Sequence, residues 1–280
     1  MIKLSVMDFE TTGKDSKVCR TTEFGAARVD ITHVPGNEVV KDWFDYDVKG
    51  YMNNLVYHPD YPALEQEVLD TCPHINDDVL KVSGISFYAA MTNLVLLFHA
   101  HGWPDYMLAH NSDYDEDVFR NEMRRHEAEL KANFDDETLQ RLWNLKWMCS
   151  IRDVQYPPRF TCKKLSHLAF DLGVNMQGRS LHKAIDDVLL VVDMLKAAQV
   201  NWITIIEQFN IPFVIVKAMI PPPFGKGNDG GVGKDACKLN KYKWQDIGDF
   251  NLPNSWLKKL KADQVELEES ILGYPLRIVK

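Results

Sequence analysis

The sequence predicts an α/β protein, in which helices flank a β-sheet and a small α+β domain follows at the C-terminal end. Short runs rich in β-branched and apolar residues come first, and runs with helical spacing follow, with one or two further strand-like runs among them. This order is typical of helices packed on a sheet. Three prolines and several glycines after residue 220 then change the composition. We therefore expect a main domain at residues 1–205, a linker at 206–225 and a small domain at 226–280.

The predicted strands of the main domain are short and apolar. They are expected at residues 2–9, 23–32, 37–48 and 106–111. The predicted helices have apolar residues three and four apart, and they are expected at 76–84, 86–102, 114–130, 162–174 and 180–199. Asn76 is placed as the N-cap of the first of these helices. In the small domain, residues 242–250 and 255–272 are expected to form a strand and one or two helices.

Composition and charge narrow the class of protein. The chain is 45% hydrophobic and 26% charged, which is typical of a folded domain. No segment has the pattern of a signal peptide or the length of a membrane span, so we expect no membrane partner and a cytoplasmic location. Its five cysteines contain no Cys-x-x-Cys pair, which argues against a disulfide framework or a structural zinc site. We therefore expect an intracellular protein whose cysteines are free thiols.

The net charge of −8 argues against a broad basic surface that grips duplex DNA. The charge is unevenly distributed. Residues 1–216 hold 21 Lys and Arg against 32 Asp and Glu, whereas residues 217–280 hold 11 against 8. The C-terminal part is therefore the better place to attract a polyanion.

Two carboxylates, Asp8 and Glu10, end the first predicted strand. Side chains two apart on a strand point to the same face, so these acids would converge at one place. Acid-x-acid spacing alone is weak, since chance supplies roughly six such pairs in a chain of this composition. A buried pair of like charges is nevertheless costly without a partner, and Mg²⁺, which prefers oxygen ligands, would relieve the repulsion.

Two further acids lie on the apolar sides of predicted helices. At 100° per residue, Asp115 shares a face with Val118 and Phe119, and Asp187 lies at the edge of an apolar stripe, whereas Asp117 and Asp186 point away. Singly, each could be an N-cap or a solvated edge residue. Acids turned toward the core from three separate segments favour a metal-binding cluster.

His182 lies five residues before Asp187, near Ser180, which could cap the helix. A lone histidine is more often an ordinary packed or surface residue than a catalytic one. Here it is close in sequence to the acid cluster and titrates near neutral pH. His58, His74, His99, His101, His110 and His126 show no ligand spacing and are interpreted as structural or surface residues.

The segments "DFETTG", "LAHNSDYD" and "HKAIDD" together resemble the three motifs of the DEDDh (DnaQ-like) 3′-5′ exonuclease family, over roughly residues 1–198. The resemblance implies an RNase H-like mixed sheet. It also implies metal ligands at Asp8, Glu10, Asp115 and Asp187, a general base at His182, and contacts of Thr11, Thr12 and Gly13 with the terminal nucleotide. Two Mg²⁺ ions, replaceable by Mn²⁺, would serve the reaction. Tyr114 stands where the family usually has Phe.

The expected activity is metal-dependent release of nucleotides from the 3′ end of DNA, with a role in DNA repair. The expected partner is single-stranded or 3′-ended nucleic acid, with a homodimer or a polymerase or repair partner left open. An exoribonuclease of the same family is an alternative. An inactive module that binds nucleic acid or a polymerase is another, although all five signature residues are present.

The C-terminal segments "PPFGKG", "YKWQDI" and "LPNSWLKKL" resemble, less specifically, the small domain that follows the nuclease in exodeoxyribonuclease X and related proteins. Lysines 226, 241 and 243 alternate with Tyr242 and Trp244 in the manner of a platform for single-stranded nucleic acid. An ordinary small domain with a solvated lysine face is an equal alternative. The segment "GKGNDGGVGKDA" is not a phosphate-binding loop, because Asn228 replaces its first glycine and Asp235 its Ser or Thr.

Overall fold

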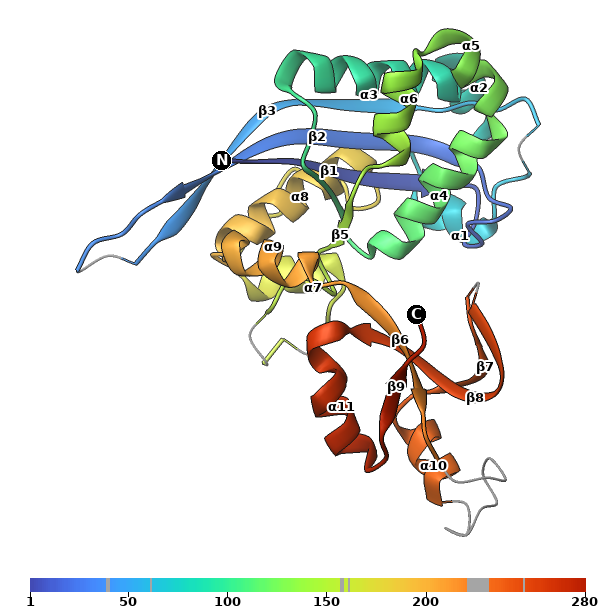
Figure 1. Cartoon of the computed structure of the whole chain (residues 1–280). Helices are drawn as coiled ribbons and strands as arrows, with labels where there is room; N and C mark the ends of the chain where they lie inside the picture. The colour runs from blue at the N-terminus through green and yellow to red at the C-terminus, as the bar shows by residue number, and fades with distance from the viewer. Residues whose placement is uncertain (39–40, 61, 157–158, 161, 221–231, 249) are drawn as a thin grey trace. The chain divides into compact units, whose positions relative to one another are not determined.

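A computed structural model describes the chain from residue 1 to 280, except residues 39–40, 61, 157–158, 161, 221–231 and 249 (Figure 1). The chain divides into two compact units, Met1–Ile205 and Ile206–Lys280. Among the described residues no single helix is long and apolar enough to cross a membrane. Two consecutive helices meet that test only as a pair, with a bend of 109° between them.

The first unit is built on a mixed sheet, five-stranded over the described residues, with the strand order β3-β2-β1-β4-β5. β2 pairs antiparallel with β1 and β3, whereas β4 runs parallel to β1 and to β5. The strands are β1 (Ile2–Thr11), β2 (Thr21–Val34), β3 (Trp43–Leu55), β4 (Tyr106–Ala109) and β5 (Trp147–Cys149). The α/β prediction is therefore confirmed, with a mixed sheet at its centre.

Helices cover both faces of this sheet (Figure 1). The helices of this unit are α1 (Gln66–Thr71), α2 (Asp77–Ser83), α3 (Phe87–His101), α4 (Ser112–Arg125), α5 (Glu127–Asn133), α6 (Asp136–Trp143), α7 (Leu165–Asp171) and α8 (Ala184–Ala197), and α9 (Trp202–Asn210) continues into the second unit. One core joins β1 and β2 to α3, α4 and α6. Helix α8 contacts β1, β2 and β3 and lies on the side opposite to α3.

Strand alternation decides which residues of β1 enter which layer. Met7 and Phe9 join the core with α3 and α4, where Phe9 stacks on Phe24 with ring centroids 4.4 Å apart. Asp8 and Glu10 consequently point to the opposite face, toward α8. Phe9 is correspondingly buried.

Some predicted boundaries in this unit are wrong. The helix expected at 114–130 is two helices, α4 and α5, because the chain leaves helical geometry at His126. The third strand runs over Trp43–Leu55, later than the expected 37–48. Asn76 does cap α2, since its Oδ1 accepts a hydrogen bond from Val79 N at 3.0 Å.

The second unit has its own antiparallel sheet, four-stranded over the described residues, with the order β7-β8-β6-β9. Its elements are β6 (Phe213–Ala218), α10 (Val232–Leu239), β7 (Lys243–Ile247), β8 (Phe250–Lys261), the short 3₁₀ helix η1 (Ala262–Gln264), α11 (Val265–Leu272) and β9 (Leu276–Ile278). Residues from α10, α11 and one face of the sheet form a separate hydrophobic core. The expected small α+β domain is present.

Two expectations for the C-terminal part need correction. The described residues of the predicted linker at 206–225 are largely ordered, since they include the end of α9 and all of β6, and residues 221–225 lie outside the described residues. Residues 255–261 were expected to lie in a helix but are the end of β8, in which Trp256 and Leu260 point into the core.

The predicted aromatic platform is also wrong in part. Tyr242 is only 5% exposed and belongs to the core of the second unit, so its ring cannot stack on a base. Trp244 packs against Trp256, with ring centroids 5.2 Å apart. Lys226 lies outside the described residues. Alternation along a strand places neighbouring residues on opposite faces, which separates the lysines from the aromatic rings.

Candidate metal centre

The end of β1 brings Asp8 and Glu10 to the face of the sheet that α8 covers. Asp8 pairs with Gly25 of β2, and Glu10 pairs with Glu23. Residues directly opposite in an antiparallel pair share a face, so Glu23 joins the two predicted acids. Asp8 and Glu10 are both half-buried.

Because Gly25 has no side chain, the start of α8 can pack against β2 beside Asp8. A β-carbon at Gly25 would lie 2.6 Å from the carbonyl carbon of Ala184, the first residue of α8. No other residue fits this close approach without a shift of the backbone. Asp187, in the first turn of α8, is thereby held beside β1 and β2.

The segment before α8 brings His182 to the same place. His182 is exposed and adopts a left-handed conformation, with φ of 62°. Its main-chain N donates to Asp187 Oδ2 at 3.3 Å. Ser180 does not cap the helix as expected, because α8 begins only at Ala184, and Ser180 N donates to Asp186 Oδ2.

Asp115 reaches the cluster from the first turn of α4. That helix follows β4, which runs parallel to β1, so its start lies near the end of β1. Phe9 N donates to Asp115 Oδ1 at 3.3 Å, and Asp115 is 3% exposed. The structure therefore brings together all four acids and the histidine that the sequence singles out.

Burial disfavours the charged form of all four acids, and repulsion from the other acids adds to this at Asp8 and Glu10. Burial, and then the charges of Asp115, Glu10 and Asp187, raise the pKa of Asp8 well above its ordinary value. Burial raises the pKa of Glu10 and of Asp115 to about 8, and that of Asp187 to about 6. In the described part of the chain, none of the four forms an ion pair with Lys or Arg. Such a cluster requires a cation or bound protons.

The donor set fits a divalent cation. One ligand atom each from Glu10, His182 and Asp187 lie within 4.8 Å of one another. Asp187 Oδ1 is buried and has no hydrogen-bond partner among the described residues. A buried orphan oxygen is costly, and coordination to a metal would satisfy it. The carboxylate oxygens around it are the ligands that Mg²⁺ and Mn²⁺ prefer.

The predicted nucleotide contacts, Thr11, Thr12 and Gly13, follow directly after the acids. Thr11 Oγ1 donates to Gly13 O at 2.7 Å, and Thr12 Oγ1 accepts from Arg20 N at 3.0 Å. Both threonines are buried and engaged within the protein, and only Gly13 is exposed. The Tyr114 hydroxyl donates to Gly13 O at 2.8 Å.

The residues that support these acids were not predicted from the sequence. Cys72 Sγ donates to Glu10 Oε2 at 3.2 Å, and burial raises the pKa of that thiol to about 12. His74, interpreted from the sequence as a structural or surface residue, has Nε2 2.7 Å from Glu23 Oε2. These contacts join residues far apart in the chain. The local signal was the acid Glu23, which stands directly before the uncharged run at residues 24–27.

A second group, His58, Glu122 and His126, also has ligand atoms within 4.8 Å of one another. A guanidinium occupies their centre: Arg20 Nη2 lies 2.6 Å from His58 Nδ1 and 3.0 Å from His126 Nε2, and Arg20 Nε donates to Glu122 Oε1 at 3.0 Å. Burial lowers the pKa of His58 to about 4, so its neutral ring can accept from Arg20. We interpret this group as a buried ion-pair network and not as a metal site.

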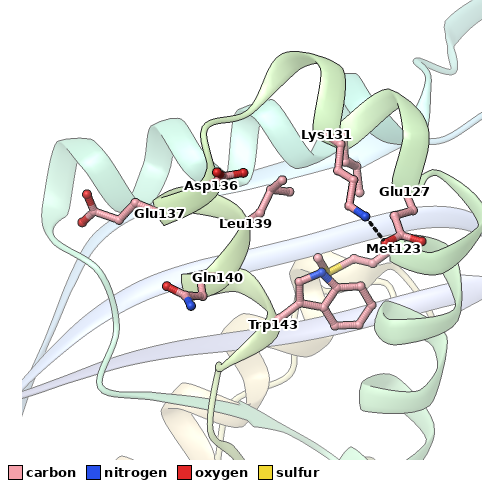
Figure 2. A pocket seen from close by; sticks show the side chains of 9 residues that line it. Met123, Glu127, Lys131, Asp136, Glu137, Leu139, Gln140 and Trp143 are labelled. Carbon is pink, nitrogen blue, oxygen red and sulfur yellow. Dashed lines mark ion pairs between the residues drawn. The ribbon is translucent and has the colours of Figure 1, made fainter.

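A pocket of about 510 Å³ lies between α4, α5 and α6 (Figure 2). Leu139 and Trp143 contribute apolar surface, and the ion pair between Lys131 and Glu127, 2.6 Å long, lies at its edge. None of the four acids lines it. It is therefore separate from the candidate metal centre.

Comparison with known proteins identifies the fold. No family model matches the chain, and no curated protein sequence matches it. Solved structures of E. coli exonuclease I do match: the zinc-bound complex with single-stranded DNA has a TM-score of 0.55 at 15% identity, and the complex with a dA16 oligonucleotide has 0.56 at 15%. Each match covers 98% of this chain and 68% of the other. The chain thus has the fold of exonuclease I.

Proposed function

We propose that this chain is a metal-dependent 3′-5′ exonuclease of the DEDDh type that acts on DNA. One observation carries the proposal: Asp8, Glu10, Asp115 and Asp187 meet beside one another, and among the described residues no Lys or Arg is paired with any of them. The likeness to exonuclease I supports the fold in which this cluster occurs. His182 beside the cluster favours the histidine branch of the family.

The four carboxylates would hold two Mg²⁺ ions, with Mn²⁺ able to replace them. When bound, the ions lower the pKa of the attacking water and stabilise charge on the phosphate and the leaving 3′ oxygen. Asp8 and Glu10 approach from the sheet, and Asp115 and Asp187 from two helices. Acids from separate elements can surround a scissile phosphate from several sides.

His182 would take the proton from the attacking water through its imidazole ring. The ring is exposed to solvent, and the main chain of His182 is tied to Asp187 by a hydrogen bond. This tie keeps the base next to an acid of the cluster. Because a protonated imidazole cannot act as a base, the ring must be neutral to take this proton.

The preference for single-stranded DNA rests on two observations. The matching exonuclease I structures include complexes with single-stranded DNA and with dA16 and dT13 oligonucleotides. In addition, one face of the sheet in the second unit is strongly basic. On β6 this face carries Phe213 and Lys217, which pair with Lys261 and Leu257 of β8. Its cations are Lys217, Lys243, Lys259, Lys261 and Arg277.

This basic face has the composition of a surface for single-stranded nucleic acid. Among the described contacts, none of its five cations forms an ion pair. Phe213 is 49% exposed, with Lys259 Nζ 5.0 Å from the centre of its ring. Lys261 also lies over this ring, and its Nζ donates to Gln208 O. Cations without an acidic partner beside an exposed aromatic ring can bind phosphates while a base stacks. This face replaces the platform that the sequence suggested around Tyr242.

The test is cleavage of 5′-labelled single-stranded DNA in the presence of Mg²⁺. We expect products that shorten from the 3′ end, and no cleavage in EDTA or by the Asp115→Asn variant. Asp117→Asn is the matched control, because Asp117 is exposed on the same helix and should leave the rate unchanged. A substrate with a 3′ phosphate tests the polarity.

RNA of the same sequence is the second substrate. Much faster cleavage of RNA than of DNA would contradict the DNA preference and favour the exoribonuclease alternative. Absence of cleavage on both substrates would overturn the proposed activity and leave a nucleic-acid-binding module.

A further inference from the structure

The connection between α1 and α2 contacts two acids of the cluster region at once. Cys72 Sγ lies 3.2 Å from Glu10 Oε2, and two residues later His74 Nε2 lies 2.7 Å from Glu23 Oε2. Glu10 and Glu23 are directly opposite each other on β1 and β2. One short segment therefore reaches both strands of the candidate metal centre.

Glu23 passes this contact on to α8. Glu23 is only 1% exposed, and its Oε2, which faces His74, also accepts from Ala184 N at 3.4 Å. Its other oxygen, Oε1, accepts from Asn53 Nδ2 of β3 at 2.6 Å. Ala184 begins α8, three residues before Asp187 and two after His182. Glu23 thus links β3, the α1–α2 connection and the first turn of α8.

Cys72 and His74 are hydrogen-bond partners of Glu10 and Glu23, whose carboxylates would be costly to bury without partners. A buried carboxylate such as Glu23 needs hydrogen bonds, and all three of its described partners donate through nitrogen. Cys72 packs with Ile75 and Leu80 in a small core of its own, which fixes the position of its thiol. The orientation of Glu10 is therefore set from outside β1.

We propose that Cys72 and His74 form a positioning clamp for the metal centre, in which Cys72 orients Glu10 and His74 acts through Glu23 on the first turn of α8. This inference rests on the proposed function. Both are positioning residues, since Cys72 acts through Glu10 and His74 through Glu23. Loss of such supporting hydrogen bonds weakens metal affinity or activity by about 10- to 100-fold in metalloproteins.

The test measures Mn²⁺ binding by calorimetry together with kcat and KM on single-stranded DNA. We expect His74→Ala and Cys72→Ala to weaken Mn²⁺ binding by about tenfold or more and to lower kcat, with KM for DNA nearly unchanged. His74→Gln and Cys72→Ser keep a donor in place and should restore most of both. Cys237→Ala is the matched control, because Cys237 is a buried free thiol in the second unit.

A purely structural role predicts a different result. If His74→Ala and Cys72→Ala lower the melting temperature but keep the wild-type Mn²⁺ affinity and kcat, the clamp is wrong. Amide hydrogen exchange measured without metal distinguishes failure of the clamp from failure of the proposed function, because it needs no cleavage of DNA. Faster exchange at residues 182–188 in His74→Ala but not in His74→Gln supports the clamp even if the wild type cleaves nothing, and unchanged exchange overturns it.

Discussion

The main chain of Ala184 lies so close to Gly25 that a β-carbon at Gly25 would come within 2.6 Å of the Ala184 carbonyl carbon. The contact joins β2 to the first residue of α8, and α8 carries Asp187. Because the obstructing atoms are backbone, the helix itself must move to accommodate any side chain. The position of one proposed metal ligand therefore depends on a glycine of the neighbouring strand.

Gly25→Ala is expected to reduce stability and activity together. Overpacking of this kind costs about 1–3 kcal/mol, and displacement of α8 should lower kcat by at least tenfold. Thermal unfolding and the DNA assay measure the two effects. The control is Gly273→Ala, at φ of 75° in the second unit, which costs about 1–2 kcal/mol through strain but leaves Asp187 in place. A wild-type kcat in Gly25→Ala would contradict the dependence.

Tyr114→Phe tests the loop after β1. The Tyr114 hydroxyl lies 2.8 Å from Gly13 O and 2.6 Å from Thr11 Oγ1, so its removal should cost about 1 kcal/mol and loosen the predicted nucleotide contacts. We expect a several-fold higher KM for DNA with a smaller change in kcat. Tyr46→Phe removes a comparable hydroxyl, 2.7 Å from Trp202 Nε1, and should lower stability without raising KM. Equal KM values in both variants would count against the role of the loop.

The raised carboxyl pKa values predict a pH dependence of stability without metal. The pKa of Glu10 rises from 4.5 and that of Asp115 from 3.8, both to about 8, so between these values the folded chain binds more protons than the unfolded chain. The free energy of unfolding must then fall as pH rises, by up to about 1.4 kcal/mol per pH unit for each acid. His58, with its pKa lowered to about 4, has the opposite effect, but only below pH 6.5.

The measurement is the melting temperature in EDTA between pH 6.5 and 8.5, where the two acids dominate among these groups. We expect the melting temperature to fall over this range, and to fall less steeply in Asp115→Asn. Since metal binds the deprotonated acids, added Mn²⁺ should raise the melting temperature more at pH 8.5 than at pH 6.5. A Mn²⁺ effect independent of pH would contradict the assignment of these ligands.

The acid cluster could be predicted from the sequence because each acid obeys a local period. Asp8 and Glu10 are two apart on a strand, and Asp115 and Asp187 follow the apolar side of their helices, which are buried as expected. Glu23 and His74 could not be found in this way, because their partnership joins positions 51 residues apart. No local spacing records such a contact.

The C-terminal unit was less predictable for the same physical reason. The segment from Ser255 to Lys261 has spacing that suits a helix, yet residues 257–261 pair with β6, and tertiary pairing overrides the local preference. Tyr242 and Trp244 were expected to form one nucleic-acid-binding surface together with Lys243. In the strand they alternate with it, and the pairing of Lys243 with Leu257 shows on which face the lysine lies.

The basic face of the second unit predicts how DNA binding depends on salt. Each phosphate contact contributes a slope of about −0.7 to log K against log salt for a single strand, so Lys259→Ala should weaken binding and reduce the slope by about 0.7. Lys258 is the matched control on the same strand, because it points to the opposite face and is paired with Glu268 Oε1 at 2.7 Å. Binding of an oligo-dT in EDTA, which prevents cleavage, measures both slopes. If Lys258→Ala and Lys259→Ala change the slope equally, DNA does not distinguish the two faces of the sheet. The basic face is then not the site at which DNA binds.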